Sequence, residues 1–286
     1  MPRFKPTISI LSLILVTALL GCQPSPPSSS GEETRLVSVS VLPQAYFVER
    51  IGGDQISVNV MVGPGDEAHT YEPTPQQMRL LTQSSLFLSI GVEYEDAWLS
   101  RFADINPEMR IVDSSAGIVR IPMPTHLHAG EAETEEADAN HLDPHVWLSP
   151  LNAKIIARNT LDALTELVPE KAAQFEANYQ ALISDIDLLD QEIQAALADK
   201  HQRAFMVFHP AWGYFAREYH LEQVAIQTGG QDPTASELSQ LVDLAREKHI
   251  EVIFIQPGYS RADAEALAEE INGQIVTVDP LAKDWL

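Results

Sequence analysis

Cysteine and basic side chains are scarce in this sequence of 286 residues. The single cysteine excludes a framework of disulfides and any zinc or iron–sulfur site built from several thiolates. Only 18 Lys and Arg stand against 41 Asp and Glu, which gives a formal net charge of −23. Because nucleic-acid binding needs clustered cations that contact phosphates, this balance argues against a nucleic-acid partner. It leaves open a cation as partner, and the hydrophobic share of 45% is too high for a wholly disordered chain.

The N-terminus has the pattern of an export signal. Two basic residues precede an uncharged apolar run over 8–20, which is too short to span a bilayer comfortably as a lasting helix. The run ends in Leu-Leu-Gly-Cys, which resembles a bacterial lipobox with Cys22 as the lipidated residue; the alternative is a plain secretory signal with an incidental cysteine. We expect residues 1–21 to be removed and 22–34 to form a flexible tether. The folded part is then exported, either lipid-anchored to the outer face of the cytoplasmic membrane or periplasmic.

Short apolar segments alternate with helical patterns in two sets, which predicts βαβ units. The strand-like segments are 36–42, 56–62, 86–90 and 109–113, and then 204–208, 223–227, 251–255 and 274–279. Thr74 before a proline, and Thr234 with Glu237, are typical of helix starts. We therefore expect an α/β fold with two lobes, over 35–168 and 200–286, each a mostly parallel β-sheet flanked by helices.

A long helix is expected between the lobes. Residues 170–199 contain neither Gly nor Pro, and apolar residues recur there every three or four positions. This stripe consists of Phe175, Tyr179, Leu182, Ile186, Leu189, Ile193 and Leu197. It predicts one rigid helix of roughly 45 Å over 169–199 that joins the two lobes. The alternative is an ordinary helix pair that belongs to one lobe.

One segment breaks the α/β pattern. Residues 124–143 hold three histidines, His126, His128 and His141, among six acidic residues and almost no large apolar side chain. Such a stretch cannot bury enough surface to offset its ordering entropy. We expect it to form a mobile loop.

Four candidate ligands lie at strand ends or in loops of both lobes. His69 follows the segment 56–62, His145 follows the acidic loop, and His209 and Asp279 end strand-like segments of the second lobe. The carboxyl ends of parallel strands are where open α/β sheets bind ligands. A lone histidine at a strand end is more often an ordinary hydrogen-bonding residue, but the joint pattern favours a site.

These motifs resemble, in their order, the solute-binding lipoproteins of bacterial ABC importers for zinc and manganese. The matching segments are AHTYEPTP around His69, DPHVWLSP around His145, VFHPAWGYF around His209 and VDPL around Asp279, together with the lipobox at Cys22. The resemblance implies two lobes joined by a rigid helix, with the ion held in the cleft between them. It implies that the three histidines are metal ligands and that Asp279 is a fourth ligand or a near neighbour. It also implies a non-enzymic protein that works with a membrane permease, and we expect a monomer.

Zinc is the metal that the donor set favours. Imidazole suits tetrahedral zinc, whereas manganese favours oxygen-rich sites, and manganese members of the family typically carry a carboxylate where this sequence has His209. The insertion with His126, His128 and His141 resembles the zinc branch and suggests weaker contacts for zinc, although a solvated, dispensable loop explains it equally well. Zinc would be the transported ligand. A manganese- or iron-binding member of the family is the alternative.

Two rival functions come from other classes. Three histidines with an open fourth position also describe a zinc hydrolase. The sequence has no His-Glu-x-x-His motif and no well-placed general base, although Glu67 and Glu72 are near His69. A lipoprotein for adhesion to host surfaces is the other rival, and nothing in the sequence favours it.

The remaining features have structural interpretations. His201, His220 and His249 stand at the ends of predicted elements and are expected to be structural or surface residues. Ordinary core packing is the favoured explanation for the aromatic residues beside the candidate ligands, which are Trp147, Trp212 and Tyr214. The family pattern implies a final helix after Asp279, whereas this sequence ends at Leu286. We therefore expect either a truncated chain or an incompletely covered second lobe.

Overall fold

The computed structural model describes 34–63, 65–66, 70–123, 142–227, 231–258 and 261–286. Strands and helices alternate along this part of the chain, as the sequence predicts. Among the residues so described, no helix combines the length and the apolar character needed to cross a bilayer.

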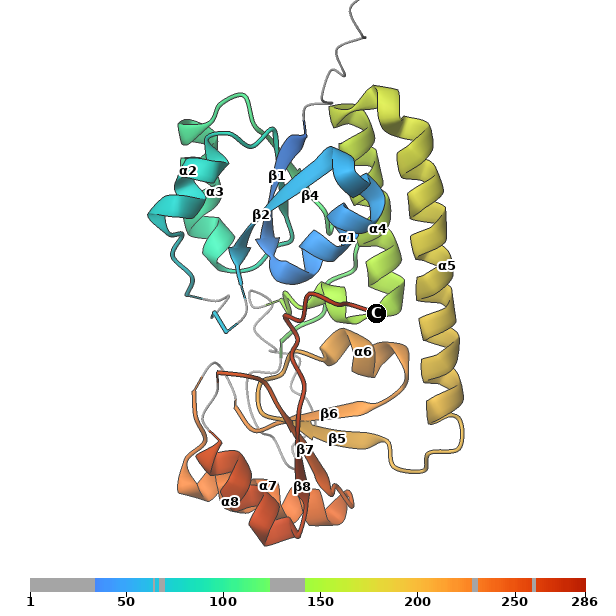
Figure 1. Cartoon of the computed structure of the whole chain (residues 1–286). Coiled ribbons are helices and arrows are strands. Elements are labelled where there is room, and N and C mark those ends of the chain that lie inside the picture. Colours follow the sequence, from blue (N-terminus) through green and yellow to red (C-terminus); the bar gives the residue numbers. More distant parts are fainter. Residues whose placement is uncertain (1–33, 64, 67–69, 124–141, 228–230, 259–260) are drawn as a thin grey trace, which may run out of the picture. The chain divides into compact units, whose positions relative to one another are not determined.

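The first lobe, in the upper part of Figure 1, is built on a parallel sheet. Its four strands have the order β2-β1-β3-β4. The strands are β1 (Arg35–Val41), β2 (Ile56–Val62), β3 (Leu86–Ser89) and β4 (Arg110–Asp113). In the central strand β1, Val39 pairs with Val60 of β2 and with Leu88 of β3. Val37, Val39 and Val41 on one face of β1 and Ser38 and Ser40 on the other have no exposed surface, as expected for a parallel strand that is covered on both faces.

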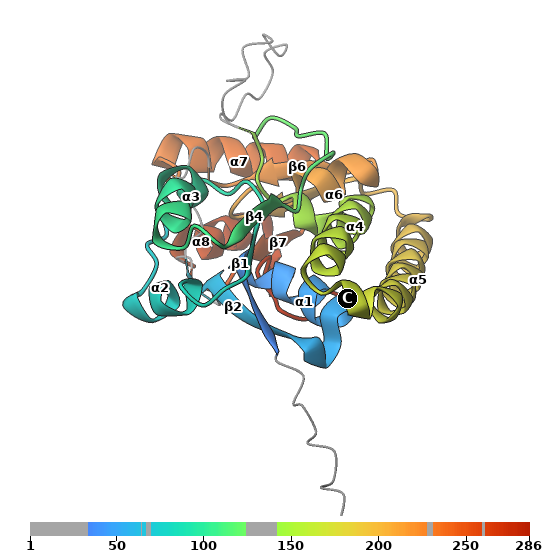
Figure 2. The ribbon, with the colours of Figure 1, turned by 90° about the horizontal axis from the view of Figure 1, so that it is seen from above.

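Helices lie on both sides of this sheet (Figure 2). They are α1 (Leu42–Gly52) and α4 (Pro150–Leu167) on one side, and α2 (Pro75–Leu81) and α3 (Tyr94–Ile105) on the other. Thr74 caps α2 by accepting a hydrogen bond from Gln77 N at 3.3 Å, which confirms the predicted helix start. Gln77 Nε2 also donates to the carbonyls of Val60 and Met61 at 2.8 and 2.6 Å. The start of α2 is thereby tied to the end of β2, at both ends of the connection that contains His69.

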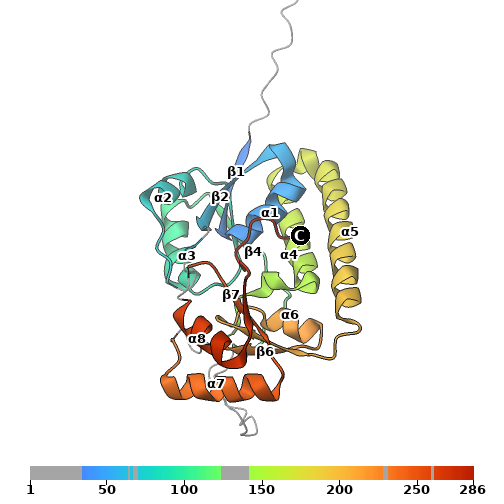
Figure 3. The ribbon, with the colours of Figure 1, turned by 60° about the horizontal axis from the view of Figure 1, so that its bottom comes forward.

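The second lobe repeats the same plan with a parallel sheet in the order β6-β5-β7-β8. Its elements are β5 (Ala204–Val207), α6 (Gly213–Glu218), β6 (Glu222–Ala225), α7 (Ala235–Glu247), β7 (Val252–Ile255), α8 (Ala262–Ile271) and β8 (Gln274–Thr277). Helices α7 and α8 lie together on one side of this sheet (Figure 3), where Met206, Ile253 and Leu241 belong to a separate apolar core. The capping box predicted at Thr234 and Glu237 begins α7.

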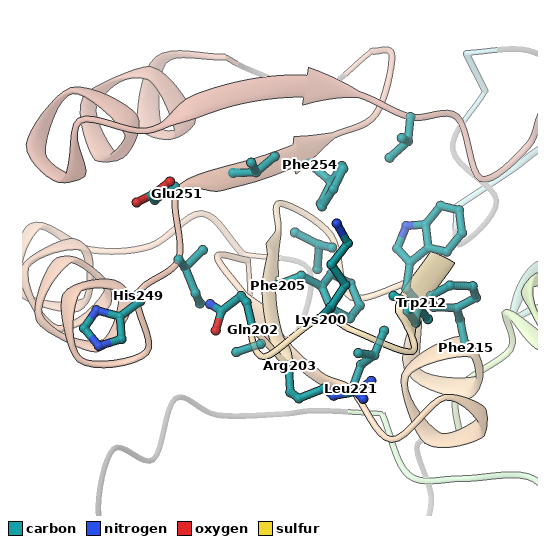
Figure 4. Close-up of a pocket in the computed structure, with 16 residues that line it drawn as sticks. Lys200, Gln202, Arg203, Phe205, Trp212, Phe215, Leu221, His249, Glu251 and Phe254 are labelled. Atoms are coloured by element: carbon teal, nitrogen blue, oxygen red, sulfur yellow. The ribbon is translucent and has the colours of Figure 1, made fainter. Parts of the chain in front are cut away.

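The opposite face of the second sheet carries an apolar groove of about 780 Å³ (Figure 4). Phe205 and Phe254, whose ring centroids are 6.3 Å apart, lie on neighbouring strands, and Trp212 closes part of the groove. Side chains alternate between faces along a strand, so these residues point away from the core under α7 and α8. Neither His145 nor His209 is among the lining residues, and the groove is separate from the site described below.

Helix α5 (Ala172–Leu197) stands between the two lobes in the chain. Its 26 residues correspond to about 39 Å, and they form one helix rather than the alternative helix pair. Its fully or nearly buried side chains belong to the core of the first lobe: Phe175, Tyr179, Leu182 and Ile186. Leu189 and Ile193 are only partly buried and line a crevice with Trp212. The predicted fold class, two parallel sheets flanked by helices with a long helix between them, is confirmed.

The segment after β8 returns to the first lobe (Figure 1). Trp147 Nε1 donates a hydrogen bond to the carbonyl of Pro280 at 2.8 Å, and Trp285 Nε1 donates to the carbonyl of Trp147 at 2.6 Å. The Trp285 ring also packs on Phe47, with centroids 5.4 Å apart. Asp279 is therefore followed directly by a segment that is held by the first lobe.

Candidate metal site

The structure brings two of the predicted ligands together and describes a third. His145, His209 and Asp279 lie within the described residues. The other predicted metal contacts and the predicted lipidation site lie outside them: His69, His126, His128, His141 and Cys22.

His145 is held by a short, well-anchored segment of the first lobe. It precedes the 3₁₀ turn Val146–Leu148, which leads directly into α4 through the cap residue Ser149. Ser149 Oγ accepts a hydrogen bond from Asn152 N at 3.3 Å, and a proline follows the cap at the first helical position. His145 is only 5% exposed. The local sequence thus fixes the backbone on the C-terminal side of the ring.

His209 occupies the predicted strand-end position in the second lobe. It follows β5 by two residues, and the intervening Phe208 donates its N–H to the Phe254 carbonyl at 2.8 Å, which extends the pairing with β7. Pro210 follows and cannot continue a strand ladder, so the backbone turns away there. His209 is also 5% exposed.

The two rings meet through their Nε2 atoms. His145 Nε2 and His209 Nε2 are 3.3 Å apart, and the ring planes make an angle of 76°. Two nitrogens bound to one zinc ion at about 2.0–2.1 Å would be about 3.3 Å apart at a tetrahedral angle and about 2.9 Å apart at a right angle. The observed separation therefore fits two ligands of one tetrahedral ion.

Polar partners on the far side of each ring orient these nitrogens. Asp143 Oδ1 lies 2.9 Å from His145 Nδ1, and because a carboxylate only accepts hydrogen bonds, Nδ1 carries the proton. Gln227 Oε1 lies 3.3 Å from His209 Nδ1 and serves the second ring in the same way. Both Nε2 atoms then present lone pairs to the same small space, an arrangement that a cation stabilises.

One aromatic side chain, Trp147, packs against the pair. Trp147 meets the His145 ring in an edge-on contact with centroids 5.4 Å apart and is 1% exposed. Tyr214 has no exposed surface. The predicted core role of Trp147 and Tyr214 is confirmed by their burial. Trp212 differs, since it is only partly buried and its backbone N–H donates to Gln223 Oε1 at 2.7 Å.

Asp279 is placed differently from the two histidines. Its Oδ1 accepts a hydrogen bond from Leu281 N at 2.9 Å, and the residue lines a crevice with Trp212 and Trp285. Within the described part of the chain, no group of three or more His, Cys, Asp or Glu residues is arranged to hold a metal ion. Asp279 therefore does not complete such a group with His145 and His209 here, and its role as a fourth ligand stays a prediction.

The buried carboxylate of Glu95 lies at the carboxyl edge of the first sheet, but its oxygens already accept hydrogen bonds from the turn that precedes α3. Glu95 is 3% exposed and accepts hydrogen bonds from Ile90 N and Gly91 N, each at 2.9 Å, and from the Ser40 hydroxyl. Burial raises the pKa of Glu95, while these hydrogen bonds act in the opposite direction. Glu95 holds the turn between β3 and α3.

The remaining histidines in the described residues have backbone roles or lie at the surface. His220 and His249 follow α6 and α7 with φ of 55° and 54°, so each stands in the left-handed conformation that often ends a helix. His201 is exposed. The structure thus places all three as the sequence analysis expects.

Sequence reasoning missed the outer partners Asp143 and Gln227. Asp143 is counted in the sequence among the acids of the solvated insertion, yet it is fully buried. Its position two residues before His145 could have indicated that it contacts this histidine. No local sequence pattern indicates the contact of Gln227 with His209, because that contact depends on the pairing of β5 with β6.

Comparison with known proteins gives a consistent match over the described chain. A family model described as ZnuA, the periplasmic component A of zinc-uptake complexes, matches residues 37–285. A crystal structure of ZnuA is 39% identical, with a TM-score of 0.80, and the match covers 88% of this chain and 94% of that one. A zinc-bound ZnuA deletion mutant is also 39% identical, with a TM-score of 0.79 and coverage of 88% and 93%.

Curated relatives include proteins named for two metals. The zinc-binding lipoprotein AdcA of Streptococcus pneumoniae is 27% identical over 243 residues, which are 84% of this chain and 48% of AdcA. The manganese-binding lipoprotein MntA of Halalkalibacterium halodurans is 28% identical over 243 residues, with coverage of 83% and 76%. The chain therefore spans about half the length of AdcA.

Proposed function

Since this chain belongs to the ZnuA family of periplasmic components of zinc-uptake complexes, we propose that it captures zinc between its two lobes and delivers the ion to an ABC permease. The family consists of non-catalytic solute-binding proteins, which argues against the alternative of a zinc hydrolase. The observation that carries the proposal is the approach of His145 Nε2 and His209 Nε2 to 3.3 Å.

The proposed ligand set joins both lobes. His145 and His209 supply the described pair, His69 is proposed as the third ligand, and Asp279 or a water molecule as the fourth. Gln77 joins the described residues at both ends of the connection that carries His69, and this supports the proposal for that segment. The ion would then be bound by side chains from three segments that are distant in sequence.

Zinc is preferred over manganese on the chemistry of the donors. Two neutral imidazoles at a tetrahedral separation suit zinc, whereas manganese favours carboxylate and carbonyl oxygens. The outer partners leave Nε2 of each ring as the donor. Manganese is the alternative, because a manganese-binding lipoprotein is also among the relatives.

Calorimetric titration of zinc into the parent and into His145→Ala and His209→Ala tests the proposal. Each substitution removes a donor, so we expect an affinity loss of more than about 100-fold, larger than the loss of an outer partner causes. His201→Ala, which changes an exposed histidine, is the matched control and should bind like the parent. Unchanged zinc binding in either site variant would refute the ligand assignment, and a preference for manganese in competition would favour the alternative.

The chain is further proposed to be exported and anchored through lipid on Cys22. The lipobox-like sequence at 19–22 and the lipoprotein relatives support this part of the proposal. The mass of the N-terminal peptide of the mature protein tests it, since a peptide that begins with unmodified residues before Cys22 contradicts the anchor.

A further inference from the structure

We propose that Asp143 is a positioning residue of the metal site, because its carboxylate orients the ring of His145. The missing side chain of Gly213 leaves space for that carboxylate. The second lobe, to which Gly213 belongs, would thereby orient a proposed ligand of the first lobe. The inference rests on the proposed function for its effect on zinc, but its structural part concerns the ring of His145 alone.

Asp143 holds the His145 ring and backbone with one carboxylate oxygen. Oδ1 accepts hydrogen bonds from His145 N at 2.8 Å and from His145 Nδ1 at 2.9 Å. The backbone of Asp143 is itself fixed, because its N–H donates to the Ile121 carbonyl at 2.8 Å. Asp143 has no exposed surface. This carboxylate therefore sets both the rotation of the ring and the nitrogen that carries the proton.

The other oxygen of Asp143 is pressed against the second lobe. Oδ2 is buried and has no hydrogen-bond partner among the described residues. A Cβ atom placed on Gly213, the first residue of α6, would lie 2.6 Å from this oxygen and 3.1 Å from Ile121 Cδ1. Gly213 does not have positive φ, so a side chain is excluded there by space rather than by backbone conformation. Any side chain at 213 would displace the carboxylate that orients His145.

The residue after Gly213 holds the same segment. The Tyr214 hydroxyl donates to the Asp143 carbonyl at 2.7 Å and accepts from Ile121 N at 3.3 Å. The first two residues of α6 thus contact both the side chain and the backbone of Asp143. Because α6 belongs to the second lobe, the orientation of His145 depends on the position of α6 against Asp143.

Replacing the carboxylate by an amide weakens the acceptor without changing the shape. In Asp143→Asn the His145 backbone N–H keeps the amide oxygen at the Oδ1 position, so Nδ1 retains an acceptor, but a neutral amide oxygen accepts more weakly than a carboxylate. The proton is then held less firmly on Nδ1, and a larger fraction of rings carries it on Nε2, where it blocks the lone pair needed by a metal. In Gly213→Ala the carboxylate is kept but moved away from Nδ1, so both variants should disturb the same ring.

The first test reads the ring in metal-free protein. Nitrogen-15 NMR of the parent should show His145 with the proton on Nδ1, and both Asp143→Asn and Gly213→Ala should change that signal. Asp113→Asn is the matched control, because the Asp113 carboxylate caps a turn of the same lobe by accepting from Ser115 N and Oγ. A parent ring with its proton on Nε2, or no change in either variant, overturns the inference.

The second test measures zinc affinity. Asp143→Asn should lower it about 10- to 100-fold, and Gly213→Ala should lower it about tenfold. The double variant should be no weaker than Asp143→Asn alone, because both changes act through one contact. Additive losses, or parent-like affinity in Gly213→Ala, contradict it. If His145→Ala binds zinc like the parent, the proposed function fails, while the NMR result still decides the role of Asp143.

Discussion

At the residue scale, the proton on each imidazole decides what the site can bind. Asp143 and Gln227 accept from the Nδ1 atoms of His145 and His209, which leaves both Nε2 atoms to face one another. The specificity that we propose therefore comes from neutral rings and their outer partners. The large negative charge of the chain contributes solubility and weak, non-specific attraction for cations.

Glu95 makes the unfolding free energy depend on pH in a defined direction. Burial raises its folded pKa above 4.5, so its contribution to stability is complete below about pH 4.5 and is lost as pH rises through the folded pKa. Glu95→Gln cannot ionise. In urea unfolding at several pH values between about 4 and 7, the unfolding free energy of the variant should therefore rise relative to that of the parent as pH rises. If the difference in unfolding free energy between variant and parent stays constant, or if the parent becomes relatively more stable as pH rises, the raised pKa of Glu95 is contradicted.

At the element scale, the start of α2 is tied to the end of β2, and the connection between them carries the proposed ligand His69. Gln77 accepts from Thr74 N at 2.9 Å and donates to the Val60 and Met61 carbonyls at the end of β2. Tyr71 also donates to Gln77 Oε1 at 2.5 Å, and its ring packs on Tyr94. One side chain thus joins both ends of the connection between β2 and α2.

Gln77→Ala should loosen that connection. Loss of these hydrogen bonds should lower the unfolding free energy by about 1–3 kcal/mol, measured by chemical denaturation. If His69 is a ligand, zinc affinity should fall as well, because the connection that carries it is held less firmly. Gln76→Ala, at the exposed neighbouring position of the same helix, should leave both quantities near the parent values. Parent-like zinc affinity in a destabilised Gln77→Ala would argue against a role for this connection.

At the scale of the whole molecule, the two lobes are joined by more than α5. The segment after β8 returns to the first lobe through Trp285, and Glu218 of α6 accepts hydrogen bonds from the Ser149 hydroxyl and, at 3.2 Å, from Leu151 N. Each lobe supplies one histidine of the described pair, so these ties help to hold the two rings close together.

The sequence predicts the fold well because its signals are local. Eight strand-like segments, the caps at Thr74 and Thr234, and the apolar stripe of α5 all depend on neighbouring residues, and each is found in the structure. The approach of His145 to His209 was expected from the resemblance to the family, since only His209 follows a strand and the two residues belong to different lobes.

The outer partners depend on distant contacts and were harder to predict. Asp143 belongs to an acid-rich segment of the sequence, and its burial depends on contacts with distant residues such as Gly213 and Tyr214. The same holds for Asp279, whose strand-end position predicts a ligand although its Oδ1 accepts from Leu281 N. The order of the strands places a residue at the edge of a sheet, but contacts with neighbouring residues determine the direction of its side chain.

The most direct test of the proposed zinc ligands is a crystal structure of the zinc-loaded protein with anomalous diffraction recorded at the zinc absorption edge. We expect one zinc peak about 2.0–2.1 Å from both His145 Nε2 and His209 Nε2, with Nδ1 of His145 still hydrogen-bonded to Asp143. A zinc peak away from these two nitrogens, or coordination through Nδ1 of either ring, would contradict it.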